Sequence, residues 1–114
     1  KVLNLGGNGA KESYISGEGL ESLPLLKQLE KLDLGYCRNL TNTGLLELLG
    51  KCSATLKDLY LWGTEISGEI LADWMTLHAP GKLRRLLLSL ENVFAADIER
   101  IRTALPHCNV LTNN

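Results

Sequence analysis

Leucines alternate with other residues in three short stretches of the chain. These stretches, LEKLDLGYC, LKDLYLWGT and LRRLLLSLE, begin at Leu29, Leu56 and Leu83, and each starts 27 residues after the one before. All three carry leucine at their first, fourth and sixth positions. Alternation of this kind predicts a short β-strand that points both inner leucines to one side and the residue between them to the other.

Each predicted strand is followed by a turn and by a segment with helical periodicity. Ser16, Thr41 or Asn42, and Ser67 are positioned to cap these helices at their N-termini. We expect the apolar residues at helical spacing to face a common core; they are Leu45, Leu48, Leu49 and Cys52, then Ile70, Leu71, Trp74 and Met75, and finally Ile98, Ile101 and Leu105. One strand and one helix cannot bury their apolar sides alone. The copies must therefore stack, with parallel strands on one side and helices on the other.

The ends of the chain extend this pattern. VLNLGGN supplies Leu3 and Leu5 as a degenerate first copy, and ALPHCNVLTNN predicts a last short strand over Asn109 to Leu111. The 114 residues thus predict one domain, 1–114, with repeats at approximately 1–28, 29–55, 56–82 and 83–114. The first copy lacks a polar cap. We therefore expect a piece of a longer protein, or a short protein that hides its edge by forming a homodimer.

The spacing resembles the leucine-rich repeat signature, L-x-x-L-x-L-x-x-C/N-x-L. LEKLDLGYCRNLTNTGLLELLGKC is similar to its cysteine-containing and ribonuclease-inhibitor-like subclasses. The resemblance implies an α/β fold, a right-handed solenoid with short parallel strands on the concave face and helices on the convex face. It also implies that Cys37, Thr64 and Asn8 bond the backbone behind the strand. Glu91 departs from the signature, so we expect that turn to be distorted, with Asn92 as a substitute.

Side chains that point away from the leucines should line up in columns across neighbouring strands. One column reads Asn4, Asp33, Tyr60 and Leu87, and the next reads Gly6, Gly35, Trp62 and Ser89. Exposed aromatic groups beside arginines are the composition of protein-binding hot spots. The predicted protein-binding residues are Asp33, Tyr36, Asp58, Tyr60, Trp62, Arg84, Arg85 and Leu87. The alternative is that Trp62 and Tyr36 fold over the turns and cover the core locally.

Composition mainly excludes classes of function. A net charge of −1 gives no electrostatic reason to expect nucleic acid or an anionic membrane as partner, and Arg84, Arg85, Arg100 and Arg102 do not share one side. No apolar run approaches the roughly 20 residues that span a bilayer. The three cysteines, Cys37, Cys52 and Cys108, fit a reducing compartment, so a cytoplasmic location is expected, with one disulfide plus a free thiol left open.

Catalytic chemistry is not indicated, and no cofactor or metal is expected. The cysteines and the two histidines, His78 and His107, show no C-x-x-C or other zinc spacing. His107 and Cys108 are adjacent in a strand-entry turn, where we expect their side chains to point to opposite faces. The glycines at residues 6–9 lack the Lys-Ser/Thr of a phosphate loop. The prediction is that the protein is not an enzyme.

The expected function is recognition of a protein ligand through the concave strand face. The resemblance implies the ligand-sensing repeats of an innate-immune type receptor or a related signalling protein. Two alternatives stay open. The run C-R-N-L-T at 37–41 resembles the LxxCxxLT motif in the substrate-recognition repeats of F-box-type ubiquitin ligases, and a free-standing enzyme inhibitor would bind through the same face.

Overall fold

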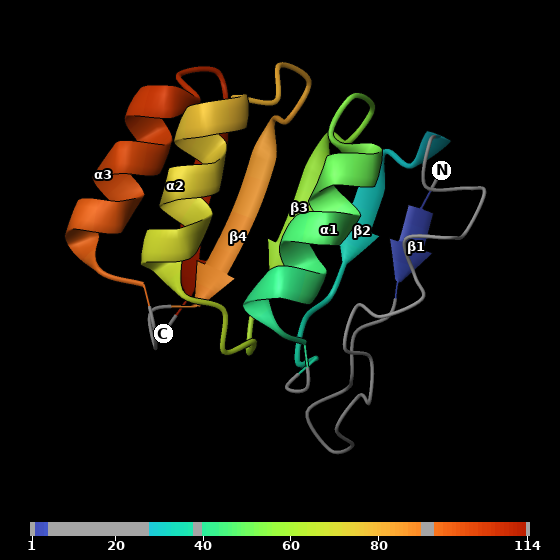
Figure 1. Ribbon diagram of the computed structural model, residues 1–114, viewed down its shortest axis with the longest axis horizontal. Coiled ribbons are helices and arrows are strands. Elements are labelled where there is room, and N and C mark those ends of the chain that lie inside the picture. Colours follow the sequence, from blue (N-terminus) through green and yellow to red (C-terminus); the bar gives the residue numbers. More distant parts are fainter. Residues whose placement is uncertain (1, 5–27, 38–39, 90–92, 114) are drawn as a thin grey trace.

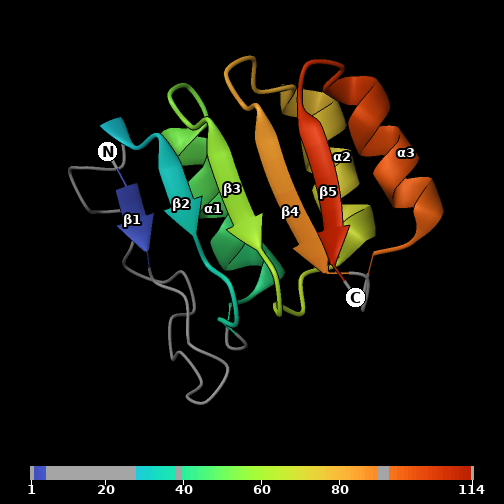
Figure 2. The same cartoon turned by 180° about the vertical axis from the view of Figure 1, so that it is seen from behind.

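The fold is α/β, with one parallel sheet covered by helices. The computed structural model describes residues 2–4, 28–37, 40–89 and 93–113. Strands β1 to β5 lie side by side in chain order, and the later strands alternate with three helices; the bounds are β1 Val2–Asn4, β2 Lys31–Asp33, α1 Asn42–Cys52, β3 Asp58–Leu61, α2 Gly68–His78, β4 Arg85–Ser89, α3 Ala95–Ala104 and β5 Asn109–Asn113. The helices lie on one face of the sheet (Figure 1), and the opposite face is uncovered by them (Figure 2).

The strands pair in the register of the 27-residue interval. Lys31 of β2 lies beside Asp58 of β3, and Asp58 lies beside Arg85 of β4. β5 continues the same rows, because Arg85 pairs with Asn109. The predicted last strand is confirmed and extends to Asn113.

The leucine ladder is the row of inner apolar residues Leu32, Leu59, Leu86 and Val110, which pair across the sheet and are buried. The second inner leucines, Leu34, Leu61 and Leu88, are buried as well. These residues meet the helices in a single core, as the alternation predicted.

The helices bury most of the predicted apolar positions. In α1, Leu45, Leu48, Leu49 and Cys52 are buried, and Ile98 and Ile101 of α3 are buried with Leu105 at its end. The prediction for Ile70 was wrong, because this side chain is 38% exposed. The arc of α2 that faces the core is centred between Leu71 and Met75, which leaves Ile70 on its margin and brings in Ala72 instead.

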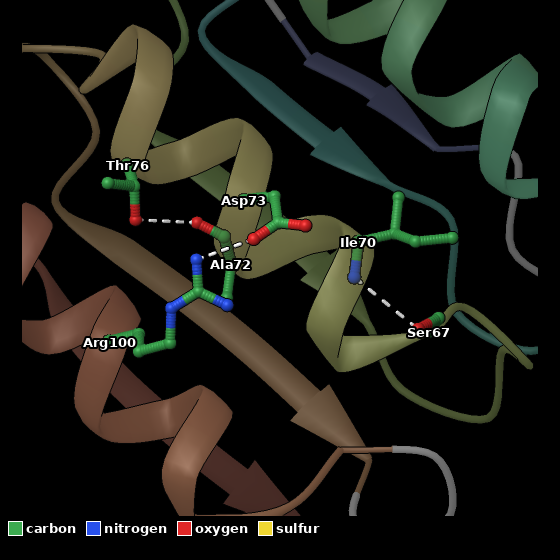
Figure 3. A network of polar contacts seen from close by, with 6 residues as sticks. All are labelled: Ser67, Ile70, Ala72, Asp73, Thr76 and Arg100. Atoms are coloured by element: carbon green, nitrogen blue, oxygen red, sulfur yellow. Dashed lines mark hydrogen bonds and ion pairs between the residues drawn. The ribbon is translucent and has the colours of Figure 1, made fainter.

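Predicted caps begin the first two helices. Thr41, not Asn42, caps α1, and its Oγ1 accepts a hydrogen bond of 2.9 Å from the Gly44 N–H. Ser67 caps α2, and its Oγ accepts one of 3.4 Å from the Ile70 N–H (Figure 3). At the N-terminus of α3 the Asp97 carboxylate accepts a hydrogen bond of 3.0 Å from the Phe94 N–H. The acidic side chain thus satisfies a backbone donor at the start of this helix.

Cys37 and Thr64, the two positions of the repeat signature that the structure describes, are buried. The Thr64 hydroxyl donates to the Leu61 carbonyl oxygen at 2.7 Å, so it bonds the end of β3 and not the loop behind the strand. Cys37 occupies the matching turn after β2 and is fully buried. No disulfide joins Cys37, Cys52 and Cys108. The predictions for Asn8, Ser16, Glu91, Asn92 and the glycines at 6–9 lie outside the described residues.

Two leucines of α2 test whether this packing stabilises the chain. Leu71 is fully buried, whereas Leu77 is 79% exposed on the same helix. We predict that Leu71→Ala lowers the free energy of unfolding by about 2–5 kcal/mol, because it leaves a cavity in the core. The matched substitution Leu77→Ala should change it by no more than about 0.5 kcal/mol. Urea denaturation followed by circular dichroism measures both, and equal losses would contradict the assignment of these faces.

Candidate functional site

The open sheet face is the side of the sheet away from the helices, and it carries the strand residues that do not enter the core. Two rows of it follow from the register. The first row is Lys31, Asp58, Arg85 and Asn109, and the second is Asp33, Tyr60, Leu87 and Leu111. The predicted column of Asn4, Asp33, Tyr60 and Leu87 is therefore confirmed, and β5 adds Leu111 to it. The predicted column that contains Trp62 is not part of this register.

Tyr60 is the centre of this face. The Lys31 ammonium lies over its ring, 4.9 Å from the centroid, in a cation–π arrangement. From the other side the Arg85 guanidinium donates to the Tyr60 hydroxyl at 3.4 Å. This hydrogen bond, together with the nearby charge of Asp58, raises the pKa of Arg85. An aromatic ring is thus held between two cations that remain accessible to solvent.

Leu87 is less accessible than the sequence predicted. It is 9% exposed, so the expectation of a large exposed apolar group there was wrong. Leu87 lies between Tyr60 and Leu111 in the same row, and neighbours on both sides restrict its contact with water. Leu111 takes its place as the accessible leucine, with 41% exposure. Sequence reasoning missed Leu111, although the same row extended by one strand leads to it.

Trp62 and Tyr36 occupy the turns that follow β3 and β2. The Tyr36 N–H donates to the Trp62 carbonyl oxygen at 2.6 Å, and the Tyr36 ring lies so close over Gly63 that a Cβ there would collide with it. Gly63 also has a φ of 72°, which favours glycine. Tyr36 therefore covers a turn, which agrees with the alternative for this residue.

The Trp62 indole is half-buried, and its Nε1 is shielded from solvent and has no hydrogen-bond acceptor among the described residues. A buried N–H without an acceptor is costly, so this position lowers the stability of the turn. Beside it, the Ser89 hydroxyl oxygen accepts from the Gly63 N–H at 2.5 Å.

The remaining predicted residues divide between two places. Asp33 and Asp58 are half-buried on the open sheet face, and one oxygen of Asp33 accepts a hydrogen bond of 2.9 Å from the Gly35 N–H. Arg84 lies instead at the edge where the strands begin, where its Nη1 donates to the Gly81 carbonyl oxygen at 2.6 Å. Arg84 is thus separated from the Tyr60 cluster.

The other two arginines of the last third are engaged on the helix side. Arg100 of α3 forms an ion pair of 2.5 Å with Asp73 of α2 (Figure 3). Arg102 donates to the Val110 carbonyl oxygen at 3.1 Å. These contacts agree with the expectation that the arginines do not form one basic stripe.

His107 and Cys108 both line a hollow of about 140 Å³ beside the start of β5. Among the described residues no hydrogen bond joins these two side chains. Burial raises the pKa of the Cys108 thiol to about 11, which keeps it protonated and poorly nucleophilic at neutral pH. Within the same residues no group of three or more His, Cys, Asp or Glu side chains could hold a metal ion.

No family model matches the sequence. In the part of the chain that the structure describes, no helix combines the length and apolar character needed to cross a bilayer.

The Cys108 thiol offers a test of its environment. Because its pKa is raised to about 11, the thiolate fraction and hence the rate of alkylation by iodoacetamide should rise about tenfold for each pH unit between pH 7 and 10. Intact-protein and peptide mass spectrometry would follow the modification, and the fully buried Cys37 should react more slowly. A rate that levels off below pH 8 would show an activated thiol and contradict this assignment.

Proposed function

We propose that the chain is a leucine-rich repeat module that recognises a protein ligand through the open sheet face. The observation that carries this proposal is the accessible cluster on that face, in which Tyr60 lies between Lys31 and Arg85 with Leu111 in the same row. No helix among the described residues covers it (Figure 2).

Three features support the repeat assignment. The strands pair at the 27-residue interval, the helices all lie on one side of the sheet, and Thr64 bonds the backbone at the position of the repeat signature. In the proposed right-handed solenoid, the open sheet face is the concave surface. Each repeat then contributes one outward residue to every row, so a ligand meets side chains from several repeats at once.

A protein ligand fits the chemistry of this face. Aromatic and arginine side chains with an accessible leucine favour an apolar anchor surrounded by polar contacts. The cations Lys31 and Arg85 alternate with the carboxylates of Asp33 and Asp58 over neighbouring positions, an arrangement that selects a partner with complementary charges.

The biological setting follows from the resemblance of the repeats. We propose that the chain belongs to the ligand-sensing repeats of an innate-immune type receptor or a related signalling protein. Substrate-recognition repeats of an F-box-type ubiquitin ligase are the second candidate, favoured by the buried Cys37 in its C-R-N-L-T context. A free-standing enzyme inhibitor is the third. A nucleotide-binding domain, an F-box or neither in the full-length gene product would distinguish the three.

Substitution of the two accessible apolar residues tests the binding face. A ligand captured from cell extract would first be identified and purified, and its affinity for the chain then measured by calorimetry. We predict that Tyr60→Ala combined with Leu111→Ala weakens binding at least about tenfold, because hot-spot side chains each contribute about 2 kcal/mol or more.

The matched control carries the same kinds of change on the helix side. Phe94 and Leu77 are 71% and 79% exposed, and Phe94→Ala combined with Leu77→Ala should leave the affinity unchanged. Circular dichroism and thermal unfolding would establish that both double variants remain folded. Loss of binding in the helix-side variant alone would place the interface on the helices and overturn the proposal.

A further inference from the structure

A second surface lies at the edge of the sheet where the strands begin. It is a hollow of about 350 Å³ lined by Gln28, Glu30, Thr55, Lys57, Lys82 and Arg84. This volume is within the range of pockets that bind small ligands. Its lining is polar and charged, unlike the aromatic cluster around Tyr60.

The backbone fixes the charged residues of this hollow relative to one another. The Lys57 N–H donates to the Glu30 carbonyl oxygen at 2.7 Å, and the Arg84 N–H donates to the Lys57 carbonyl oxygen at 2.8 Å. Glu30, Lys57 and Arg84 therefore form one row immediately before β2, β3 and β4. Neighbouring positions in such a row are about 4.8 Å apart, so their charged groups act on the same small volume.

Positive charge exceeds negative charge in the hollow. The Lys57 ammonium lies 3.2 Å from the Glu30 carboxylate, and its hydrogen bond lowers the pKa of Glu30, which is ionised at neutral pH. Lys82 and Arg84 form no ion pair with a carboxylate of the described residues. Two cations of the hollow thus have no anionic partner there.

Arg84 is held in place without using all of its donors. Its Nη1 donates to the Gly81 and Leu83 carbonyl oxygens at 2.6 and 3.4 Å. A guanidinium group has five N–H donors, so those on Nη2 and Nε stay available for an external acceptor. Because the protein already orients the guanidinium group, the Arg84 side chain loses less conformational entropy when an anion binds.

Arg84 also lines the neighbouring hollow of about 140 Å³, whose other residues are mainly apolar and include Pro80, Leu83, Leu105 and Pro106. A dry cavity of about 150 Å³ in another protein holds a benzene ring, which sets the scale of what this recess accepts. If an anionic group binds in the larger hollow, the carbon atoms attached to it can therefore occupy the smaller, mainly apolar hollow on the other side of Arg84.

We propose that the larger hollow is a binding site for a phosphate monoester, with Arg84 and Lys82 as its main cationic contacts. Two cations without a partner match the nearly double negative charge of this group at neutral pH, and arginine binds phosphate oxygens through parallel hydrogen bonds. The phosphate can belong to a small phosphorylated molecule or to a phosphorylated side chain of a protein. The site is separate from Tyr60 and Leu111 and does not depend on the proposed function.

Titration of the complete, nitrogen-15-labelled chain tests this site. The probes are phosphoserine, a neutral peptide with one phosphoserine, and the same peptide with serine or glutamate in its place, all at constant ionic strength. We expect saturable shifts of the backbone amide signals of Lys57, Lys82 and Arg84 with both phosphorylated probes only. Tighter binding of the phosphopeptide would assign the phosphate to a protein, and tighter binding of phosphoserine would assign it to a small molecule.

Two variants and a matched control locate the binding. Loss of one charge-assisted hydrogen bond weakens binding about tenfold or more, so Lys82→Gln and Lys82→Gln with Arg84→Gln should each reduce affinity by at least this factor. Lys51→Gln removes an exposed lysine at the end of α1, outside the hollow, and should have no effect. The Tyr60→Ala, Leu111→Ala variant should also bind phosphate normally.

Three results would overturn the proposal. One is a shift that does not saturate, and another is equal weakening by Lys51→Gln, since both indicate general attraction of anions. The third is equal binding of the glutamate peptide, which would show a carboxylate site. Lys82 is exposed in a turn, so Lys82→Gln keeps the test decisive even where the double variant fails to fold.

Discussion

Burial of the leucine ladder is the constraint on which the rest of the structure depends. Leu32, Leu59 and Leu86 face the helices only while the strands keep their register, because a slip of one residue would turn every core side chain toward solvent. Main-chain bonds reinforce this register before each strand, where the Glu30 carbonyl oxygen accepts from the N–H groups of Lys57 and Asp58 at 2.7 and 3.0 Å. Apolar burial and main-chain bonding thus select the same alignment.

The same constraint creates both candidate surfaces. Residues between the buried positions must line up on the open sheet face, and residues just before the strands must line up at its edge. The core therefore determines where Tyr60, Arg85 and Arg84 lie, but it leaves the identities of these side chains free. Sheets of one architecture can consequently carry different partners, and the chemistry of each row, not the fold, is the basis for the proposed functions.

The sequence predicted the elements better than the accessibility of single side chains. The spacing of leucines was sufficient to place the strands and two of the helix caps, because both follow from local periodicity and local hydrogen bonds. The burial of Leu87 depends on the neighbouring Tyr60 and Leu111, and the position of the Arg84 guanidinium depends on the Gly81 carbonyl oxygen. Contacts of this kind arise between strands or within turns, where periodicity carries no information. The error at Ile70 has another cause, because the periodicity of α2 itself places this residue at the margin of the buried arc.

The outer edge of β5 is less open to strand addition than an unoccupied strand edge. In a parallel strand alternate residues bond to the same side, and the Asn109 N–H donates to the Arg84 carbonyl oxygen at 2.7 Å, so Val110 directs its carbonyl oxygen away from β4. Arg102 of α3 already donates to that oxygen. A second copy that paired with β5 would have to displace this charge-assisted bond and then accommodate the arginine beside the new strand. The proposed recognition through the Tyr60 cluster needs no such displacement, because its side chains are already in place on the accessible side of the sheet.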